Sequence, residues 1–363
     1  MRISLEENSV VFILYQFHIG GVESALINLL ENIKKKRVYL IFAMNKINNE
    51  LLKKIPHNVK IIGLGINNKN ICHLIGYTRR LSKRYDFSRT HIVNFSDTLS
   101  TLIIQYSLNA KLKTSWVHCN PLTLINSRSF QLYKYLLVRN DKIVCLCESQ
   151  KNLLIKVMPK AEKKVTIIYN CVDADILSKG AQEKVDVNYK YIIKVARFDE
   201  RTKDFITLID AYCKLPKETQ DTYKLVLLGD GPDLENVRHY TRKKNNMQNI
   251  FFPGKDVNPF KWIKHSQFLV HSSTSEGFSL VLLEAMLLGK VVIASDCNCG
   301  PSDILDNGNA GFLFNVGDVD SLTCIMQNLL VNQDIINIYT NRSLVRGVEL
   351  QLKANRQVKE YFL

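Results

Sequence analysis

Short apolar runs alternate with amphipathic segments along almost the whole chain. In the first half, VVFILYQF and KIVCLC are strand-like, whereas GVESALINLLENI and LYKYLLVRN repeat apolar residues at helical spacing. Strands that are apolar throughout are typical of parallel sheets covered by helices on both faces. The predicted strands of this half are residues 10–17, 38–44, 59–65, 91–97, 114–119, 142–147 and 165–170.

The second half repeats this plan, so we expect an α/β protein with two doubly wound, Rossmann-like domains. Open sheets of this kind bind ligands at the carboxyl ends of their strands, which predicts a cleft between the two domains. We expect a first domain over residues 1–172, a second over 173–345, and a C-terminal helix over 346–363 that packs back toward the first. The apolar runs of the second half are residues 191–198, 223–231, 249–254, 267–273, 291–296 and 311–317.

Length and composition limit the class of protein. The chain has 363 residues, enough for two domains, and no apolar run long enough to span a membrane. Acidic residues precede the first apolar run, unlike a secretory signal, so a cytoplasmic location is expected. The nine cysteines form no metal-binding spacing and are interpreted as reduced thiols.

The charge is unevenly distributed. The chain carries 49 Lys and Arg against 34 Asp and Glu, a net charge of +15, and the whole excess falls within residues 1–180. A basic half beside a neutral half indicates contact with something anionic, such as a membrane surface or a lipid diphosphate. A merely solubilising surface is the alternative, and nucleic acid is disfavoured because no binding module accompanies the charge.

The segment HSSTSEGFSLVLLEAMLLGK places two carboxylates in an apolar context. Glu276 falls in a turn between a predicted strand and helix, where free helix amides favour an anionic ligand. Glu284 lies within the helix among apolar neighbours, and a buried carboxylate needs a partner. Sugar hydroxyls fit Glu276 and a ribose diol fits Glu284; a helix-dipole role and a structural ion pair are the respective alternatives.

Two cations and two glycines follow other predicted strands. Arg197 and Lys203 lie where both can bind a diphosphate and stabilise it as a leaving group, unless they belong to a solvated loop. Gly20 and Gly21 open a helix and allow phosphate to approach its amides. His118 ends an apolar strand and is either a structural residue or a donor to a sugar hydroxyl.

Together these motifs resemble the family-4 retaining glycosyltransferases of the GT-B fold, over nearly the whole chain. The family's E-x7-E signature is matched by EGFSLVLLE, its Arg and Lys pair by RFDERTK, its first glycine-rich loop by GGVES, and its junction by NCVD. GDGP resembles the turn after the second strand of the donor domain, and lacks the glycines of a dehydrogenase. One departure is that Lys203 is followed by Asp204, where many members have glycine.

The resemblance implies a role for each matched residue. Arg197 and Lys203 hold the diphosphate, Glu284 the ribose, Glu276 the sugar, and His118 a hydroxyl near the reacting carbon. The donor site further includes Gly20 and Gly21 at the distal phosphate, and Gly277, Phe278 and Ser279 at the sugar. The resemblance also implies retention by front-face attack, in which the leaving phosphate accepts the proton of the acceptor. It implies no metal and no other cofactor.

The same resemblance implies the substrates and partners. We expect transfer of a hexose or N-acetylhexosamine from a UDP-sugar to a polyprenyl-diphosphate-linked saccharide, in bacterial surface-polysaccharide synthesis. The basic first domain fits docking to an anionic membrane surface, at the inner face of the plasma membrane. Two alternatives stay open: a nucleotide-sugar epimerase of the same fold, and a non-catalytic subunit that binds sugar nucleotides.

Overall fold

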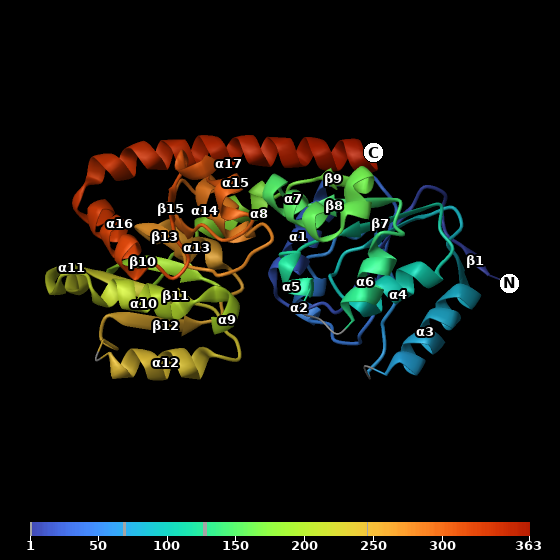
Figure 1. The fold of residues 1–363 in the computed structure, drawn as a ribbon, viewed down its shortest axis with the longest axis horizontal. Coiled ribbons are helices and arrows are strands. Elements are labelled where there is room, and N and C mark those ends of the chain that lie inside the picture. The colour runs from blue at the N-terminus through green and yellow to red at the C-terminus, as the bar shows by residue number, and fades with distance from the viewer. Residues whose placement is uncertain (1, 68–69, 126–128, 245) are drawn as a thin grey trace. The chain divides into compact units, whose positions relative to one another are not determined.

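The computed structural model describes residues 2–67, 70–125, 129–244 and 246–363. It divides into two compact units, one of residues 1–171 with 353–363, the other of residues 172–352. Each unit is built around one parallel sheet with helices on both of its faces (Figure 1). The first boundary lies one residue before the predicted one.

Unit 1 contains a seven-stranded parallel sheet in the order β4-β3-β2-β6-β7-β8-β9. Its central strands are buried along their full length, which explains their uninterrupted apolar sequence. The strands are β2 (Val10–Leu14), β3 (Val38–Phe42), β4 (Val59–Gly63), β6 (His91–Asn94), β7 (Leu112–Trp116), β8 (Lys142–Cys145) and β9 (Val165–Ile167), with β1 (Ile3–Ser4) and β5 (Tyr85–Asp86) paired separately. The helices are α1 (Gly21–Asn32), α2 (Asn49–Leu52), α3 (Ile71–Arg84), α4 (Leu99–Ser107), α5 (Leu122–Ile125), α6 (Phe130–Leu137), α7 (Glu148–Val157) and the 3₁₀ helix η1 (Pro159–Lys164).

Unit 2 contains a six-stranded parallel sheet in the order β12-β11-β10-β13-β14-β15. One helix layer packs α10 against α12 and α16, and the other packs α13 against α8 and α14. The strands are β10 (Lys190–Val195), β11 (Tyr223–Leu228), β12 (Ile250–Gly254), β13 (Phe268–His271), β14 (Val291–Ser295) and β15 (Phe312–Phe314). The helices are α8 (Ala174–Ala181), α9 (Glu200–Lys203), α10 (Phe205–Cys213), α11 (Lys217–Thr222), α12 (Leu234–Lys243), α13 (Pro259–His265), α14 (Leu280–Leu287), α15 (Pro301–Ile304), α16 (Val319–Val331) and the 3₁₀ helix η2 (Asp306–Gly308).

In both sheets the order in which the chain adds strands reverses next to the first strand, although all strands stay parallel. In unit 2 the chain runs outward from β10 to β12 and then returns to β13 on the other side of β10. In unit 1 it runs outward from β2 to β4 and returns to β6 on the other side of β2. The loops after β10 and β13, and those after β2 and β6, therefore emerge from neighbouring strands, which is where open α/β sheets bind ligands.

The last helix, α17 (Gln333–Phe362), is longer than the helix predicted over 346–363. Gly347 does not end it; a Cβ at this position would lie 3.0 Å from the Met286 Cβ, so glycine allows α17 to pack closely on α14. The end of α17 belongs to unit 1, where Tyr361 Oη lies 2.7 Å from Thr114 Oγ1 and the Phe362 ring stacks on Trp116.

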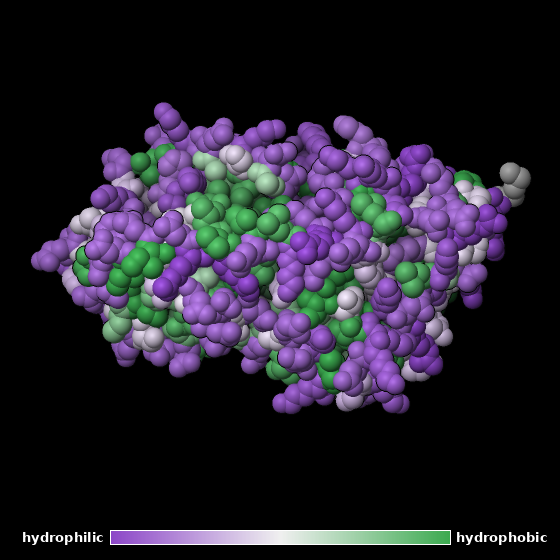
Figure 2. Space-filling view, turned by 90° about the horizontal axis from the view of Figure 1, so that it is seen from above, coloured by the Kyte–Doolittle hydropathy of each residue, from purple (hydrophilic) through white to green (hydrophobic). Residues whose placement is uncertain are grey.

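The face shown in Figure 2 is mostly hydrophilic, with hydrophobic side chains gathered in separate patches. Among the residues that the structure describes, no helix combines the length and the apolarity needed to cross a bilayer.

Candidate functional site

The loop after β10 is held by close backbone packing. A Cβ at Gly229 would lie 1.9 Å from the Ala196 carbonyl oxygen, and one at Gly231 would lie 2.3 Å from that of Phe198. The GDGP glycines are thus required because the turn after β11 packs directly on the loop that carries Arg197. The Arg197 side chain is exposed, and no hydrogen bond or ion pair joins it to another described residue.

Lys203 is the last residue of the short helix α9 rather than part of an open loop, and Asp204 follows it in the left-handed conformation, with φ of 46°. Glycine adopts this conformation most readily, which accounts for the glycine that many family members have here. Asp204 offsets its own strain by capping α10: its carboxylate accepts hydrogen bonds from Thr207 N, at 3.0 Å, and Thr207 Oγ1, at 2.7 Å.

Lys203 and Glu276 form a partly buried ion pair between the loops after β10 and β13. Lys203 Nζ lies 2.6 Å from Glu276 Oε1, and His271 Nε2 lies 2.8 Å from the same oxygen. Ser279 Oγ lies 3.0 Å from His271 Nε2. Burial alone would raise the pKa of Glu276, but the charge of Lys203 and the contact with His271 hold it below its ordinary value. Glu276 is therefore a fixed carboxylate at neutral pH.

Glu284 lies on α14, and its side chain is buried. Residue exposure is only 9%, and burial raises the pKa of its carboxyl group to about 7. No hydrogen bond or ion pair joins this carboxyl group to any other residue that the structure describes, and burial is the sole cause of its pKa shift. A buried carboxyl group without a protein partner is energetically costly, so Glu284 has the property expected of a group that binds a ligand.

The turn between Glu276 and α14 is tightly packed. The Phe278 side chain is buried, the Cys299 thiol donates to the Glu276 carbonyl oxygen at 2.8 Å, and a Cβ at Gly300 would lie 2.9 Å from the Phe278 carbonyl oxygen. Ser279 adopts the left-handed conformation, with φ of 69°, directly before α14 begins. The segment from Gly277 to Ser279 is thus rigidly placed beside the Lys203–Glu276 pair.

In unit 1, Gly20 and Gly21 begin α1 as predicted. Gly20 is extended and gives α1 no side-chain cap, and nothing lies within 4 Å of a Cβ built on Gly21. The buried carboxyl group of Glu23 stands in the first turn, with an oxygen 2.8 Å from a Cβ built on Gly20 and another 3.7 Å from His18 Nδ1. A phosphate bound at the N-terminus of α1 would therefore lie close to the carboxyl group of Glu23.

His118 lies just after β7, and its backbone is held by Asp97. The Asp97 carboxyl group accepts hydrogen bonds from the amides of His118, at 2.7 Å, and Cys119, at 2.8 Å. Burial raises the pKa of Asp97 to about 6 and lowers that of His118 to about 3, so the imidazole is neutral. His118 Nε2 is buried and has no hydrogen-bond partner among the described residues, as a group that binds a ligand would.

Sequence reasoning missed three ionisable groups near the predicted residues: Asp97, Lys194 and His271. Lys194 and His271 each stand inside an otherwise apolar strand, and both are buried. A charged or polar residue in a predicted buried strand was the signal that would have found them, because such a residue requires a partner.

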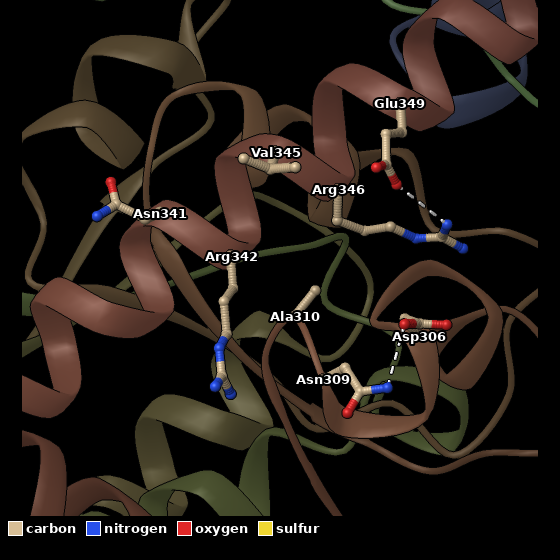
Figure 3. A pocket seen from close by; sticks show the side chains of 8 residues that line it. All are labelled: Asp306, Asn309, Ala310, Asn341, Arg342, Val345, Arg346 and Glu349. Atoms are coloured by element: carbon tan, nitrogen blue, oxygen red, sulfur yellow. Dashed lines mark hydrogen bonds and ion pairs between the residues drawn. The ribbon is translucent and has the colours of Figure 1, made fainter.

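A surface pocket lies elsewhere in unit 2. It has a volume of about 450 Å³ and opens between α17 and the segment around η2, where Arg346 pairs with Glu349 and Asn309 bonds to Asp306 (Figure 3). No predicted site residue lines this pocket. Within the described part of the chain, no three His, Cys, Asp or Glu residues cluster in a way that would hold a metal ion.

Two family models match the chain one after the other. "Glycosyltransferase Family 4" covers residues 19–176 and "Glycosyl transferases group 1" covers residues 177–343, so the two together span both units.

Relatives and solved structures match along the same length. An N-acetylgalactosamine-N,N'-diacetylbacillosaminyl-diphospho-undecaprenol 4-alpha-N-acetylgalactosaminyltransferase of Campylobacter jejuni is 23% identical over 96% of this chain and 98% of its own length. A lipopolysaccharide 1,6-galactosyltransferase of Salmonella typhimurium is 24% identical over 83% of each chain. The structure of Anabaena Alr3699/HepE in complex with UDP and glucose has a TM-score of 0.80, at 17% identity, over 97% of this chain and 98% of that one.

Proposed function

Because this chain belongs to the family-4 glycosyltransferases of the GT-B fold, we propose that it transfers a hexose or N-acetylhexosamine from a UDP-sugar, with retention and without a metal ion, to a polyprenyl-diphosphate-linked saccharide. The product would serve the synthesis of a bacterial surface polysaccharide. This pairing of donor and acceptor is supported by the UDP-bound Anabaena structure and by the undecaprenol-linked substrate in the name of the Campylobacter relative.

The observation that carries the proposal is the unpartnered, buried carboxyl group of Glu284. Such a group fits the two hydroxyls of a ribose, which would donate hydrogen bonds to it without adding charge. The same unit supplies Lys203 and the exposed Arg197, whose positive charges suit a diphosphate. A nucleoside diphosphate is the ligand class that uses all three groups.

The proposed chemistry follows from the charges. Lys203 and Arg197 stabilise the diphosphate as the bond to the sugar breaks, in the role that a metal ion fills in other enzymes. Glu276 stays ionised because Lys203 and His271 hold it, so it suits binding of a sugar hydroxyl and not donation of a proton. The proton of the acceptor passes to the leaving phosphate. For Gly20, Gly21 and His118, contacts with the distal phosphate and a sugar hydroxyl stay predictions.

The acceptor is proposed to reach the protein from an anionic membrane surface. Helix α3 of the basic unit 1 exposes Ile71 and Ile75 in its first half and the basic residues Arg79, Arg80 and Lys83 in its second half. Apolar side chains next to basic ones are the combination that binds anionic lipid. We therefore propose a peripheral location at the inner face of the plasma membrane.

A thermal-shift series with UDP, GDP, ADP and CMP tests the donor site, with the Glu284→Ala variant alongside. A ligand that binds only the folded state raises the melting temperature. We expect a selective rise with UDP that the variant loses. No rise with any nucleotide would contradict the proposal.

Assays of turnover distinguish the proposed transferase from the two alternatives, an epimerase and a non-catalytic subunit. Conversion of a UDP-sugar to an isomer without acceptor would indicate an epimerase instead. Nucleotide binding without transfer to any lipid-linked acceptor would indicate a non-catalytic subunit.

A further inference from the structure

Lys194 is a fully buried lysine in the middle of the unit 2 sheet. It lies on β10 between Ile193 and Val195 and has an exposure of 0%. An ammonium group in such a place is strongly disfavoured unless specific contacts hold it. Neither the E-x7-E signature nor the Arg197 and Lys203 pair includes this residue.

The contacts of Lys194 join the two loops that carry the candidate site. Its Nζ donates to the Lys203 carbonyl oxygen at 2.6 Å and to Ser272 Oγ at 2.7 Å. Ser272 Oγ in turn donates to the Asp204 carbonyl oxygen at 2.6 Å. One side chain thus fixes the end of α9 after β10 to the start of the loop after β13.

We propose that Lys194 is a positioning residue of the donor site, which holds the backbone of Lys203 and of Ser272 so that the Lys203–Glu276 pair keeps its geometry. This inference rests on the proposed function of that pair in donor binding. It gives Lys194 no contact with the donor; the residue acts through Lys203.

The electrostatic surroundings of Lys194 predict how its effect varies with pH. The groups that face it are Lys203 and Glu200 of α9, Asp204 before α10, His271 at the end of β13 and Glu276 in the loop after β13. The Phe205 ring lies 4.8 Å away. Burial, together with the charge of Lys203, lowers the pKa of Lys194 to about 7. Raising the pH above about 7 therefore deprotonates Lys194 and removes a positive charge next to the Lys203–Glu276 pair. The neutral amine still donates hydrogen bonds, so Lys194 continues to connect the two loops.

The test compares Lys194→Met with Lys290→Met as a matched control. Lys290 is another largely buried lysine of unit 2, and its Nζ donates to the Ser266 carbonyl oxygen at 2.7 Å. The measurement is the calorimetric Kd for UDP-glucose, whose diphosphate does not titrate in this range, at pH 6 and pH 8. At pH 6 we expect Kd to rise about tenfold for K194M and less than about twofold for K290M. The ratio of the K194M Kd to the wild-type Kd should be smaller at pH 8.

A second pair of variants covers the case in which K194M does not fold. Ser272→Ala removes one acceptor of Lys194, and Ser343→Ala removes an equally buried hydroxyl that donates to the Lys290 carbonyl oxygen at 2.8 Å. S272A should weaken binding of UDP-glucose by about threefold, and S343A should leave it unchanged.

The outcomes are distinct. Equal Kd values for K194M and K290M, or for S272A and S343A, would overturn the role of Lys194 and leave the donor site standing. Wild-type protein that binds neither UDP nor UDP-glucose would overturn the proposed function and this inference together.

Discussion

At the scale of single residues, the two glutamates of the E-x7-E segment differ because their surroundings differ. Glu276 has Lys203 and His271 on one oxygen, so burial does not neutralise it. Glu284 has no partner among the described residues, and burial raises its pKa to about 7. Two carboxyl groups eight positions apart in the chain therefore differ in charge state: the protein holds Glu276 ionised, whereas burial favours the protonated form of Glu284.

Replacing Glu284 by Gln should remove a pH dependence of stability. The folded protein holds a proton on Glu284 that the unfolded chain releases near its ordinary pKa of 4.5, so stability falls as pH rises from about 4.5 to about 7. Glutamine does not titrate. Relative to wild type, E284Q should therefore gain about 1 to 3 kcal/mol of unfolding free energy between pH 5 and pH 8.

Urea denaturation of both proteins at the two pH values measures this gain. UDP binding should weaken in E284Q at pH 8, because the ionised acceptor for the ribose is lost. A parallel pH dependence of the two proteins would contradict the raised pKa of Glu284.

Replacing Lys203 by Ala should lower turnover by about 10² or more, because the leaving diphosphate loses a fixed positive charge. Lys214→Ala is the control, since Lys214 also forms a 2.6 Å ion pair, with Asp320, but on an exposed surface. Initial rates of UDP release with a lipid-linked acceptor measure the effect. Similar rates for the two variants would show that Lys203 takes no part in the reaction.

At the scale of elements, the candidate site lies in the loops that follow two neighbouring strands. Strands β10 and β13 lie side by side because the chain returns to β10 after building β11 and β12. Their following loops carry Lys203 and Glu276, which are 73 positions apart in sequence and 2.6 Å apart in space. The junction between α9 and α10 depends on Asp204, which combines a left-handed backbone with a helix cap.

Variants of Asp204 should separate strain from capping. Asp204→Ala loses the cap and keeps the strain, so it should destabilise unit 2 by about 1 to 2 kcal/mol. Asp204→Gly loses the cap but relieves the strain, so it should cost about 1 kcal/mol less than the Ala variant. Asp318→Ala is the control: Asp318 caps α16 by accepting from Ser321 N at 3.0 Å, and its φ is −81°.

The urea midpoints of Asp204→Ala, Asp204→Gly and Asp318→Ala measure these differences in stability. If the Gly variant is no more stable than the Ala variant, the left-handed conformation of Asp204 stores no measurable strain.

At the scale of the whole molecule, the net charge of +15 is carried by the first half of the chain, whereas Lys203, Glu276 and Glu284, the residues proposed to bind the donor, lie in the second. Charge reversal on α3, Arg79→Glu with Arg80→Glu, should reduce binding to anionic liposomes at least about tenfold, because each basic residue near the surface contributes about 1 kcal/mol. Arg242→Glu with Lys243→Glu makes the same charge change on exposed residues of α12 and should have a smaller effect.

Liposome sedimentation at low and high salt measures this binding, which should weaken as salt is added. Equal binding to neutral and anionic liposomes would contradict the membrane proposal.

The sequence alone determined the features that depend on local physics. Apolar runs with helical segments between them identify two parallel α/β units, because a strand covered on both faces must be apolar throughout. The order and spacing of Arg197, Lys203, Glu276 and Glu284 after the predicted strands indicated the family, and its models match the chain over residues 19–343. The last helix was predicted over 346–363 but begins at Gln333. Its glycine, Gly347, disfavours a helix interior in isolation and is accommodated here by close packing against Met286.

Only the tertiary structure decided which of these residues pair. Strand order depends on crossovers that no local pattern encodes, so the contact of Lys203 with Glu276 and His271 appears only once β10 and β13 are neighbours. The same holds for Lys194, whose partners come from two loops. The surroundings of Glu284 are likewise decided by the tertiary structure. Whether a buried carboxyl group has a partner depends on every element packed around it, and here no described residue provides one.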